Sequence, residues 1–230
     1  MLLSVIIPTY NEAPHIGRLV AELRQHAPPG TIEVLVVDAH SPDGTAEVAR
    51  HAGATVLQAP TPGRAAQMNH GAHHATGNVL YFVHADVRIH PDYVATIRQA
   101  VADGYEAGCY RFRFDSAHPL LRLNSYGTRF KGIMSRGGDQ TLFITRTLFQ
   151  ALGGFDEYYC IMEDFDIIRR IRKRARFLIV PQDVVVSARK YATNSWVRVQ
   201  LANLTAFLLF FLRVSPRRIA HRYKTMLNYR

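Results

Sequence analysis

The segment "IEVLVVD" (residues 32–38) is apolar at most positions and then ends in an acid. A strand with apolar side chains on both faces is typical of a parallel sheet that helices cover on each side. A second apolar run, "LSVII" (residues 3–7), comes earlier in the chain and stops at Pro8. Between the two runs, four apolar residues recur at the spacing of an amphipathic helix: Ile16, Leu19, Val20 and Leu23. This order predicts a unit of strand, helix and parallel strand.

The same alternation extends through the first hundred residues. Further helices are expected at 43–53, 64–76 and 91–102, and further strands at 54–59 and 78–86. Beyond residue 105 we expect strands at 107–115 and 140–146, a helix at 163–174, two short strands and a long helix at 195–212. The alternation predicts an α/β fold with a mostly parallel sheet and helices on both faces.

The net charge of +10 is unevenly distributed along the 230 residues. Residues 1–166 contain 13 Lys and Arg against 17 Asp and Glu, whereas residues 167–230 contain 15 basic residues and one acid, Asp183. The hydrophobic content of 48% indicates a globular chain, and a chain of this length can bury a sizeable core. We therefore expect one domain followed by a basic helical extension.

Cysteine content and hydropathy bear on the compartment. Cys109 and Cys160 lie far apart without a CxxC spacing, which predicts neither a disulfide framework nor a zinc site and favours the cytoplasm. The N-terminus has no basic leader, so we expect a first strand there and no signal peptide. The apolar run 204–212 is about half of the ~20 residues that a membrane-spanning helix needs.

Polar residues follow three of the predicted strands at the point where each strand ends. Residues 9–12 follow the first strand, Asp38 follows the second, and residues 84–86 follow the fourth. Ligands of open α/β sheets bind outside the carboxyl ends of the strands. Each set could also be a turn or a helix cap, but the three together favour a ligand site. Neither GxGxxG nor GxxxxGK[ST] is present, so phosphate would have to be held by an arginine, another cation or a metal.

Four segments together resemble the inverting nucleotide-sugar glycosyltransferases of family 2, which have the Rossmann-like GT-A fold: "SVIIPTYNE" (4–12), "VVDAHSPDGT" (36–45), "HAD" (84–86) and "MEDFDIIRRIR" (162–172). "GRAAQMNHGA" (63–72) and "GGDQTLFITR" (137–146) are similar to the bacterial selenodomain-associated subgroup. The resemblance implies a nucleotide-sugar-binding catalytic domain at 1–190 and a basic amphipathic helical extension at 191–230.

The resemblance also implies roles for residues of the donor site. The turn that would surround the nucleobase and ribose consists of Pro8, Thr9, Tyr10, Asn11 and Glu12. Asp38 would accept a hydrogen bond from the base, which suits uracil, and Arg64 would meet the diphosphate. His84 and Ala85 would adjoin the donor, and Asp86 corresponds to the second acid of the DxD motif, which holds Mg²⁺ or Mn²⁺. His84 replaces the first acid, which magnesium tolerates because it keeps waters and substrate phosphates as ligands.

An inverting transfer also needs a base that takes the proton of the acceptor hydroxyl. The resemblance gives this role to Asp164 and a supporting role to Glu163, although two acids also stabilise a helix N-terminus without any catalytic role. Asp166 is expected to face solvent or to cap the helix. Three residues would border the donor sugar and the acceptor, with a structural turn as the alternative: Gly138, Asp139 and Gln140.

The segment from Trp196 to Lys224 is apolar over most faces and carries several arginines. It could pack on the catalytic domain or on a second subunit, giving a homodimer, or lie on anionic lipid as an interfacial helix. No base-reading motif accompanies it, so nucleic-acid binding is not expected. We favour a peripheral position on the inner face of the cell membrane, which suits a lipid-linked acceptor.

The resemblance, together with these observations, implies a metal-dependent, inverting transfer of a sugar from a nucleotide-diphosphate donor, expected to be a UDP-sugar, to an acceptor hydroxyl. Two alternatives remain. A sugar nucleotidyltransferase would need a Gly- and Lys-rich phosphate loop, which "PTYNEAP" (8–14) is not. A membrane-associated nucleotide-sugar-binding protein without turnover is suggested by the incomplete DxD motif.

Overall fold

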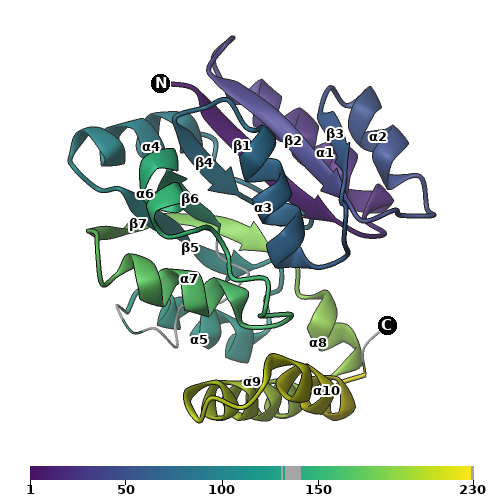
Figure 1. The fold of residues 1–230 in the computed structure, drawn as a ribbon. Helices are drawn as coiled ribbons and strands as arrows, with labels where there is room; N and C mark the ends of the chain where they lie inside the picture. Colours follow the sequence, from purple (N-terminus) through teal and green to yellow (C-terminus); the bar gives the residue numbers. More distant parts are fainter. Residues whose placement is uncertain (131, 133–140, 229–230) are drawn as a thin grey trace.

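The computed structural model describes residues 1–130, 132 and 141–228. Within these residues, seven strands form one sheet in the order β3-β2-β1-β4-β6-β5-β7 (Figure 1). The strands are β1 (Leu3–Thr9), β2 (Ile32–Asp38), β3 (Thr55–Gln58), β4 (Val79–Phe82), β5 (Ala107–Phe114), β6 (Leu142–Thr145) and β7 (Phe177–Val186). In this sheet β6 runs antiparallel to its neighbours β4 and β5, and the other pairings are parallel. The prediction of a mostly parallel sheet is confirmed.

Helices cover both faces of this sheet, as predicted. The helices of one face are α1 (Ala13–Gln25), α2 (Thr45–His51) and α4 (Tyr93–Ala102), and those of the other face are α3 (Arg64–His74), α6 (Arg146–Ala151) and α7 (Glu163–Ile171). In β1, Val5 and Ile7 belong to the first core cluster and Ile6 belongs to the second. The continuous apolar runs of the sequence therefore serve two cores, one on each side of the sheet.

Helix α3 lies unusually close to β1. A Cβ atom on Gly71 would lie 2.5 Å from Cγ2 of Ile6 and 3.0 Å from Cγ2 of Val37. A side chain at this position would have to displace two fully buried residues of the central strands. Gly71 therefore allows α3 to pack closely against β1 and β2 at this point.

The region after residue 105 differs in part from the expectation. Residues 177–186 form one strand, where two short strands were predicted. The register of β5 with β7 shifts between Tyr110 and Arg111, so the pairing is interrupted inside this strand. The shift leaves Pro181 and Gln182 outside the paired register. Proline has no N–H to donate to the sheet, so a bulge is where a strand can accommodate it. Helices α5 (Pro119–Gly127) and α6 were not predicted.

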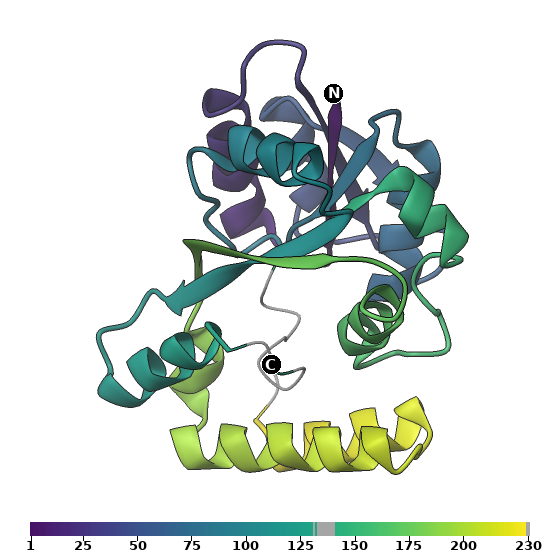
Figure 2. The ribbon, with the colours of Figure 1, turned by 90° about the vertical axis from the view of Figure 1, so that its left-hand side faces the viewer.

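The C-terminal segment forms α8 (Arg189–Thr193), α9 (Trp196–Phe211) and α10 (Pro216–Met226). Figure 2 shows α9 and α10 side by side as a layer at the bottom of the view. Their buried residues, among them Val199, Ala202 and Ile219, share one cluster with Met162 and Phe165 at the start of α7. One side of this hairpin thus packs against the start of α7. Of the helices that the structure describes, none is long and apolar enough to span a membrane.

Candidate functional site

The strand order reverses at β1, because β2 and β3 lie on one side of it and β4 lies on the other. In open α/β sheets such a switch point opens a crevice outside the carboxyl ends of the two strands. The residues that follow β1 and β4 there are the turn 10–12 and the segment 84–86. The topology therefore places both predicted segments at the edge where a ligand would bind.

Asp38, the last residue of β2, connects the ends of β1 and β2 through hydrogen bonds of its buried carboxylate. Its carboxylate accepts hydrogen bonds from the Thr9 hydroxyl at 3.0 Å and from the Ser41 amide and hydroxyl at 2.8 and 2.6 Å. The residue is 1% exposed. Its observed hydrogen bonds are internal, so its contact with a nucleobase stays a prediction.

The turn after β1 is also fixed through its backbone. The amides of Asn11 and Glu12 donate to the hydroxyls of Ser41 and Thr45, each at 2.9 Å. Buried Gln67 on α3 donates to the carbonyls of Thr9 and Val37. Sequence reasoning did not identify Ser41, Thr45 or Gln67, because a single polar residue gives no local signal of its distant partners.

The expected nucleobase residues differ in exposure. Pro8, Thr9 and Ala85 are buried, whereas Asn11 is exposed and Tyr10 exposes 60% of its surface. Asn11 has a φ of 56°, in the left-handed region that few residues other than glycine adopt. The turn therefore presents Tyr10 and Asn11 toward solvent at the switch point.

Glu12 and Asp86, which follow neighbouring strands, contact the same guanidinium. Arg189 at the start of α8 donates from Nη2 to Oε1 of Glu12 at 2.8 Å and from Nη1 to Oε2 at 3.2 Å. Its Nε lies 3.3 Å from Oδ2 of Asp86. Arg189 was not predicted as a site residue, since in the sequence it is one of many basic residues near the C-terminus.

The start of α7 reaches the same edge of the sheet through an ion pair. Nε of Arg64, the first residue of α3, lies 2.7 Å from Oε1 of Glu163. The Glu163 side chain is only 1% exposed, and neither of its oxygens has a well-aligned hydrogen-bond donor among the described residues. Asp164, the next residue, is half-buried. The contact places the start of α7 beside Arg64, and both the base role of Asp164 and the phosphate contact of Arg64 stay predictions.

The backbone before these acids is strained. Met162 is buried and has a φ of 69°, which is uncommon for a residue with a side chain. Such conformations persist where the surroundings determine them, often at functional sites. Here the strained residue directly precedes Glu163 and Asp164.

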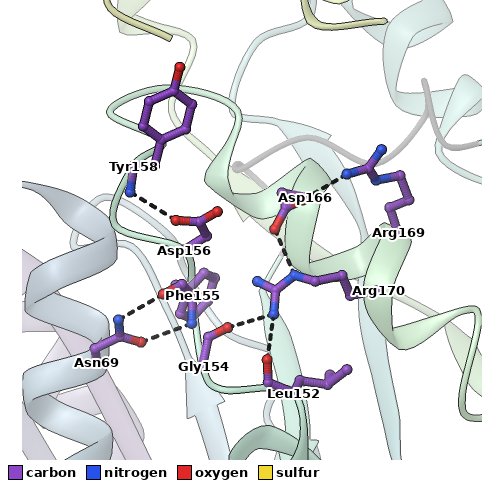
Figure 3. Close-up of polar contacts among 9 residues, drawn as sticks. All are labelled: Asn69, Leu152, Gly154, Phe155, Asp156, Tyr158, Asp166, Arg169 and Arg170. Atoms are coloured by element: carbon purple, nitrogen blue, oxygen red, sulfur yellow. Dashed lines mark hydrogen bonds and ion pairs between the residues drawn. The ribbon is translucent and has the colours of Figure 1, made fainter. Parts of the chain in front are cut away.

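Figure 3 shows how the segment leading to these acids is held. Asn69 on α3 exchanges two hydrogen bonds with the backbone of Phe155, each at 2.9 Å. Arg170 donates to the carbonyls of Leu152 and Gly154 and, at 2.7 Å, to Asp166. These contacts hold the first part of the segment 152–162 from α3 on one side and from α7 on the other.

The prediction that Asp166 faces solvent or caps the helix is wrong. Its side chain is 5% exposed and pairs with Arg169 at 3.1 Å and with Arg170 at 2.7 Å. These arginines lie three and four positions further along α7, on the same face, so their guanidinium groups cover the carboxylate. Gly138, Asp139 and Gln140 lie outside the described residues, so their role stays a prediction.

The described residues also test the expected metal. Across residues 1–130, 132 and 141–228, no three His, Cys, Asp or Glu side chains form a group that could hold a metal ion. Asp86 offers one carboxylate at the switch point, and magnesium is commonly bound by one or two carboxylates together with substrate phosphates. The residues therefore fit a divalent ion that arrives with a diphosphate ligand.

The profile of the family described as Glycosyl transferase family 2 matches residues 4–157. Glycosyltransferase AglE from Haloferax volcanii is 37% identical over 98 residues, which cover 40% of this chain and 32% of that protein. The 4,4'-diaponeurosporenoate glycosyltransferase of Staphylococcus aureus is 40% identical over 91 residues, which cover 37% of this chain and 24% of that protein. The matched segment thus spans less than half of either relative.

Solved structures with a similar fold cover nearly the whole chain. The mannosyltransferase PcManGT from Pyrobaculum calidifontis, in complex with GDP-Man and Mn²⁺, has a TM-score of 0.68 at 22% identity and covers 97% of this chain and 69% of its own. TarS from S. aureus in complex with UDP-GlcNAc has a TM-score of 0.69 at 18% identity and covers 96% and 69%. At such identities the likeness shows the fold, and it confirms the predicted α/β architecture.

Proposed function

The chain belongs to glycosyl transferase family 2 and has the GT-A fold, and on this premise we propose that it transfers a sugar from a nucleotide-diphosphate donor to an acceptor hydroxyl with inversion. The observation that carries the proposal is the contact between Arg64 and Glu163. It brings the start of α7, with Asp164, to the sheet edge where Asp86 follows β4. The proposed base and the proposed metal ligand would then lie at the same edge of the sheet.

In the proposed reaction Asp164 accepts the proton of the acceptor hydroxyl. The acceptor oxygen forms a bond to the anomeric carbon while the bond from that carbon to the diphosphate oxygen breaks, and the nucleoside diphosphate leaves. A positioned base contributes roughly 10²- to 10⁴-fold to such a rate. Glu163 keeps the helix start in place through its contact with Arg64.

The donor base is proposed to be uracil, and Asp86 is the residue that would hold Mg²⁺ or Mn²⁺ on the diphosphate. When bound, such an ion supplies positive charge to the leaving group. Two structural neighbours, each under 25% identical, support the choice of ligand class through their complexes with GDP-Man and Mn²⁺ and with UDP-GlcNAc.

Thermal stabilisation tests the donor and the metal together. We expect UDP or a UDP-sugar to raise the melting temperature with Mn²⁺ or Mg²⁺ present and not in EDTA, and we expect Asp86→Ala to remove the metal-dependent part. GDP-sugars serve as the comparison for the base. Equal stabilisation in EDTA would exclude the metal role, and donor binding without release of nucleoside diphosphate would favour a sensor.

The location is proposed from the outer side of the C-terminal hairpin. Six apolar side chains on the outer side of α9 and at its C-terminal end are between 45% and 73% exposed: Val197, Leu201, Leu204, Leu208, Phe211 and Leu212. Exposed arginines flank them: Arg198, Arg213, Arg217 and Arg218. An apolar stripe with basic neighbours suits the surface of an anionic membrane. The chain would then lie peripherally on the inner face of the cell membrane.

This location suits a lipid-linked acceptor. A cavity of about 590 Å³ lies where α5, α8 and the start of α9 meet, and its lining includes Leu121, Tyr191 and Trp196. Cavities of this size hold ligands of a few hundred daltons in other proteins. If the exposed stripe of α9 instead joins two copies of the chain, the protein will sediment as a dimer without lipid.

A further inference from the structure

Arg189 lies across the switch point of the sheet and connects the residues that follow β1 and β4. It makes two hydrogen bonds to Glu12, at 2.8 and 3.2 Å, and one longer ion-pair contact to Asp86, at 3.3 Å. The Glu12 side chain is 14% exposed and that of Asp86 is 22% exposed, whereas that of Arg189 is 54% exposed. An exposed guanidinium is therefore held at the mouth of the crevice by two largely buried carboxylates.

The two contacts differ in strength. A guanidinium that faces both oxygens of one carboxylate forms a bidentate pair, which is stronger and better oriented than a single contact. Glu12 therefore anchors Arg189. The contact with Asp86 is single and longer, so it is the one that gives way when a competing ligand arrives.

The charges of the three residues in contact show what Arg189 contributes. Glu12, Asp86 and Arg189 together carry one net negative charge. A divalent ion turns this into one net positive charge, which attracts an anionic diphosphate; without Arg189 the same ion would only neutralise the two acids. Arg64 at the start of α3 faces the buried carboxylate of Glu163 at 2.7 Å, which offsets its charge.

We propose that Arg189 is a second donor-binding cation, which covers Asp86 in the resting protein and moves onto the diphosphate when the donor binds. Glu12 holds the guanidinium through this change, and the uncovered carboxylate of Asp86 takes the divalent ion. The inference rests on the proposed function. Its consequence is that nucleotide and metal bind cooperatively, and that this coupling is reciprocal and depends on Arg189.

The test is titration calorimetry of the full-length protein with UDP and with Mn²⁺, each alone and in the presence of the other. Arg189→Met keeps the aliphatic stem and removes the charge. We expect it to weaken UDP binding with Mn²⁺ present by about 10- to 100-fold, as for a lost charged hydrogen bond. We also expect it to tighten the binding of Mn²⁺ alone, because a competitor for Asp86 has gone.

Two further variants make the test specific. Arg222→Met removes the same charge from an exposed position of α10 and should leave both affinities unchanged. Arg189→Lys keeps the charge without the fork and should give intermediate UDP affinity, which protects the test against a folding defect in Arg189→Met. Unchanged or weaker Mn²⁺ binding in Arg189→Met, with or without a loss of UDP affinity, would overturn the proposal. Arg189 would then only hold the ends of the two strands together.

The wild-type titrations separate this inference from the proposed function. If the wild-type protein binds no nucleoside diphosphate with metal, the proposed function fails and the inference fails with it. If the wild-type protein binds UDP with Mn²⁺ and Arg189→Met matches it in both affinities, the inference alone fails.

Discussion

Replacing Arg170 by methionine should destabilise the segment that positions the predicted base. The Arg170 side chain is 25% exposed and pairs at 2.7 Å with Asp166, whose side chain is 5% exposed. It also donates to the carbonyls of Leu152 and Gly154 at 2.9 and 2.8 Å (Figure 3). Methionine has a similar length and apolar character along its stem, so the change removes chiefly the charge and these hydrogen bonds.

The expected magnitude follows from burial and from what remains. Removing one partner of a buried ion pair costs about 3–5 kcal/mol. Arg169 still contacts Asp166 at 3.1 Å, and Nη2 of Arg170 has no hydrogen-bond partner among the described residues, so the lower part of that range applies. A loss of about 3 kcal/mol corresponds to a fall in melting temperature of roughly 6–12 °C for a chain of this size.

The assay is thermal and urea denaturation of Arg170→Met beside Arg169→Met. Arg169 is the matched control because it contacts the same carboxylate from a position that is 46% exposed, where an ion pair contributes about 1 kcal/mol or less. Because segment 152–162 leads directly into Glu163 and Asp164, turnover should fall more than donor affinity in Arg170→Met. Equal melting temperatures for the two variants would refute the assigned bracing role.

Three further outcomes are expected. Replacing both Leu204 and Leu208, which are 45% and 55% exposed, by serine should weaken binding to anionic vesicles by roughly tenfold or more, at about 1 kcal/mol per residue, with little change in melting temperature. The fluorescence of Trp196, the sole tryptophan, reports the binding. Unchanged binding would reject the proposal that this helix lies on a membrane surface. Burial raises the pKa of the Glu33 carboxyl, but hydrogen bonds from Ser4, Thr76 and Gly77 outweigh it and hold the pKa below its ordinary value of 4.5. The stability that Glu33 contributes is therefore complete above pH 4.5 and lost as the pH falls through the folded-state pKa. Urea denaturation of Glu33→Gln should show a shallower loss of stability below pH 4.5 than the wild-type protein. An identical pH profile for the two proteins would contradict this. Gly71→Ala should lower stability by about 1–3 kcal/mol in thermal denaturation, since its Cβ would lie 2.5 Å from Ile6, and a neutral effect would mean that α3 can move away from β1.

The first half of the fold could be predicted because its signals are local. The apolar run 32–38 and the helical spacing from Ile16 to Leu23 each lie within one element, and burial of those helix residues follows from their own spacing. Which strands pair cannot be read in this way. The antiparallel β6 lies between β4 and β5 through contacts between residues far apart in the chain, and the bulge at Pro181 resembled a break between two strands.

The candidate site was predictable where residues follow strands and not where they come from distant elements. Asp38 and Asp86 could be placed from the runs that precede them. Arg189 contacts Glu12 across 177 positions, and in the sequence it counted only as one charge of the basic C-terminal part. The position of Asp166 was predicted wrongly because Arg169 and Arg170, one turn further along α7, bury its carboxylate. The direction of these two side chains depends on how the segment 152–162 folds back.

The central claim is that Asp164 is the base of a glycosyl transfer. The most direct measurement is release of nucleoside diphosphate from UDP-sugars in the presence of Mn²⁺ by the wild-type protein and by Asp164→Asn, with the donor dissociation constant measured in parallel. We expect the wild-type protein to turn over and the variant to be slower by roughly 10²- to 10⁴-fold. Donor affinity should be nearly unchanged and the melting temperature only slightly lower, since the loss of one charge from the first turn of α7 costs about 0.3–1 kcal/mol. Near-normal turnover in the variant would contradict the account.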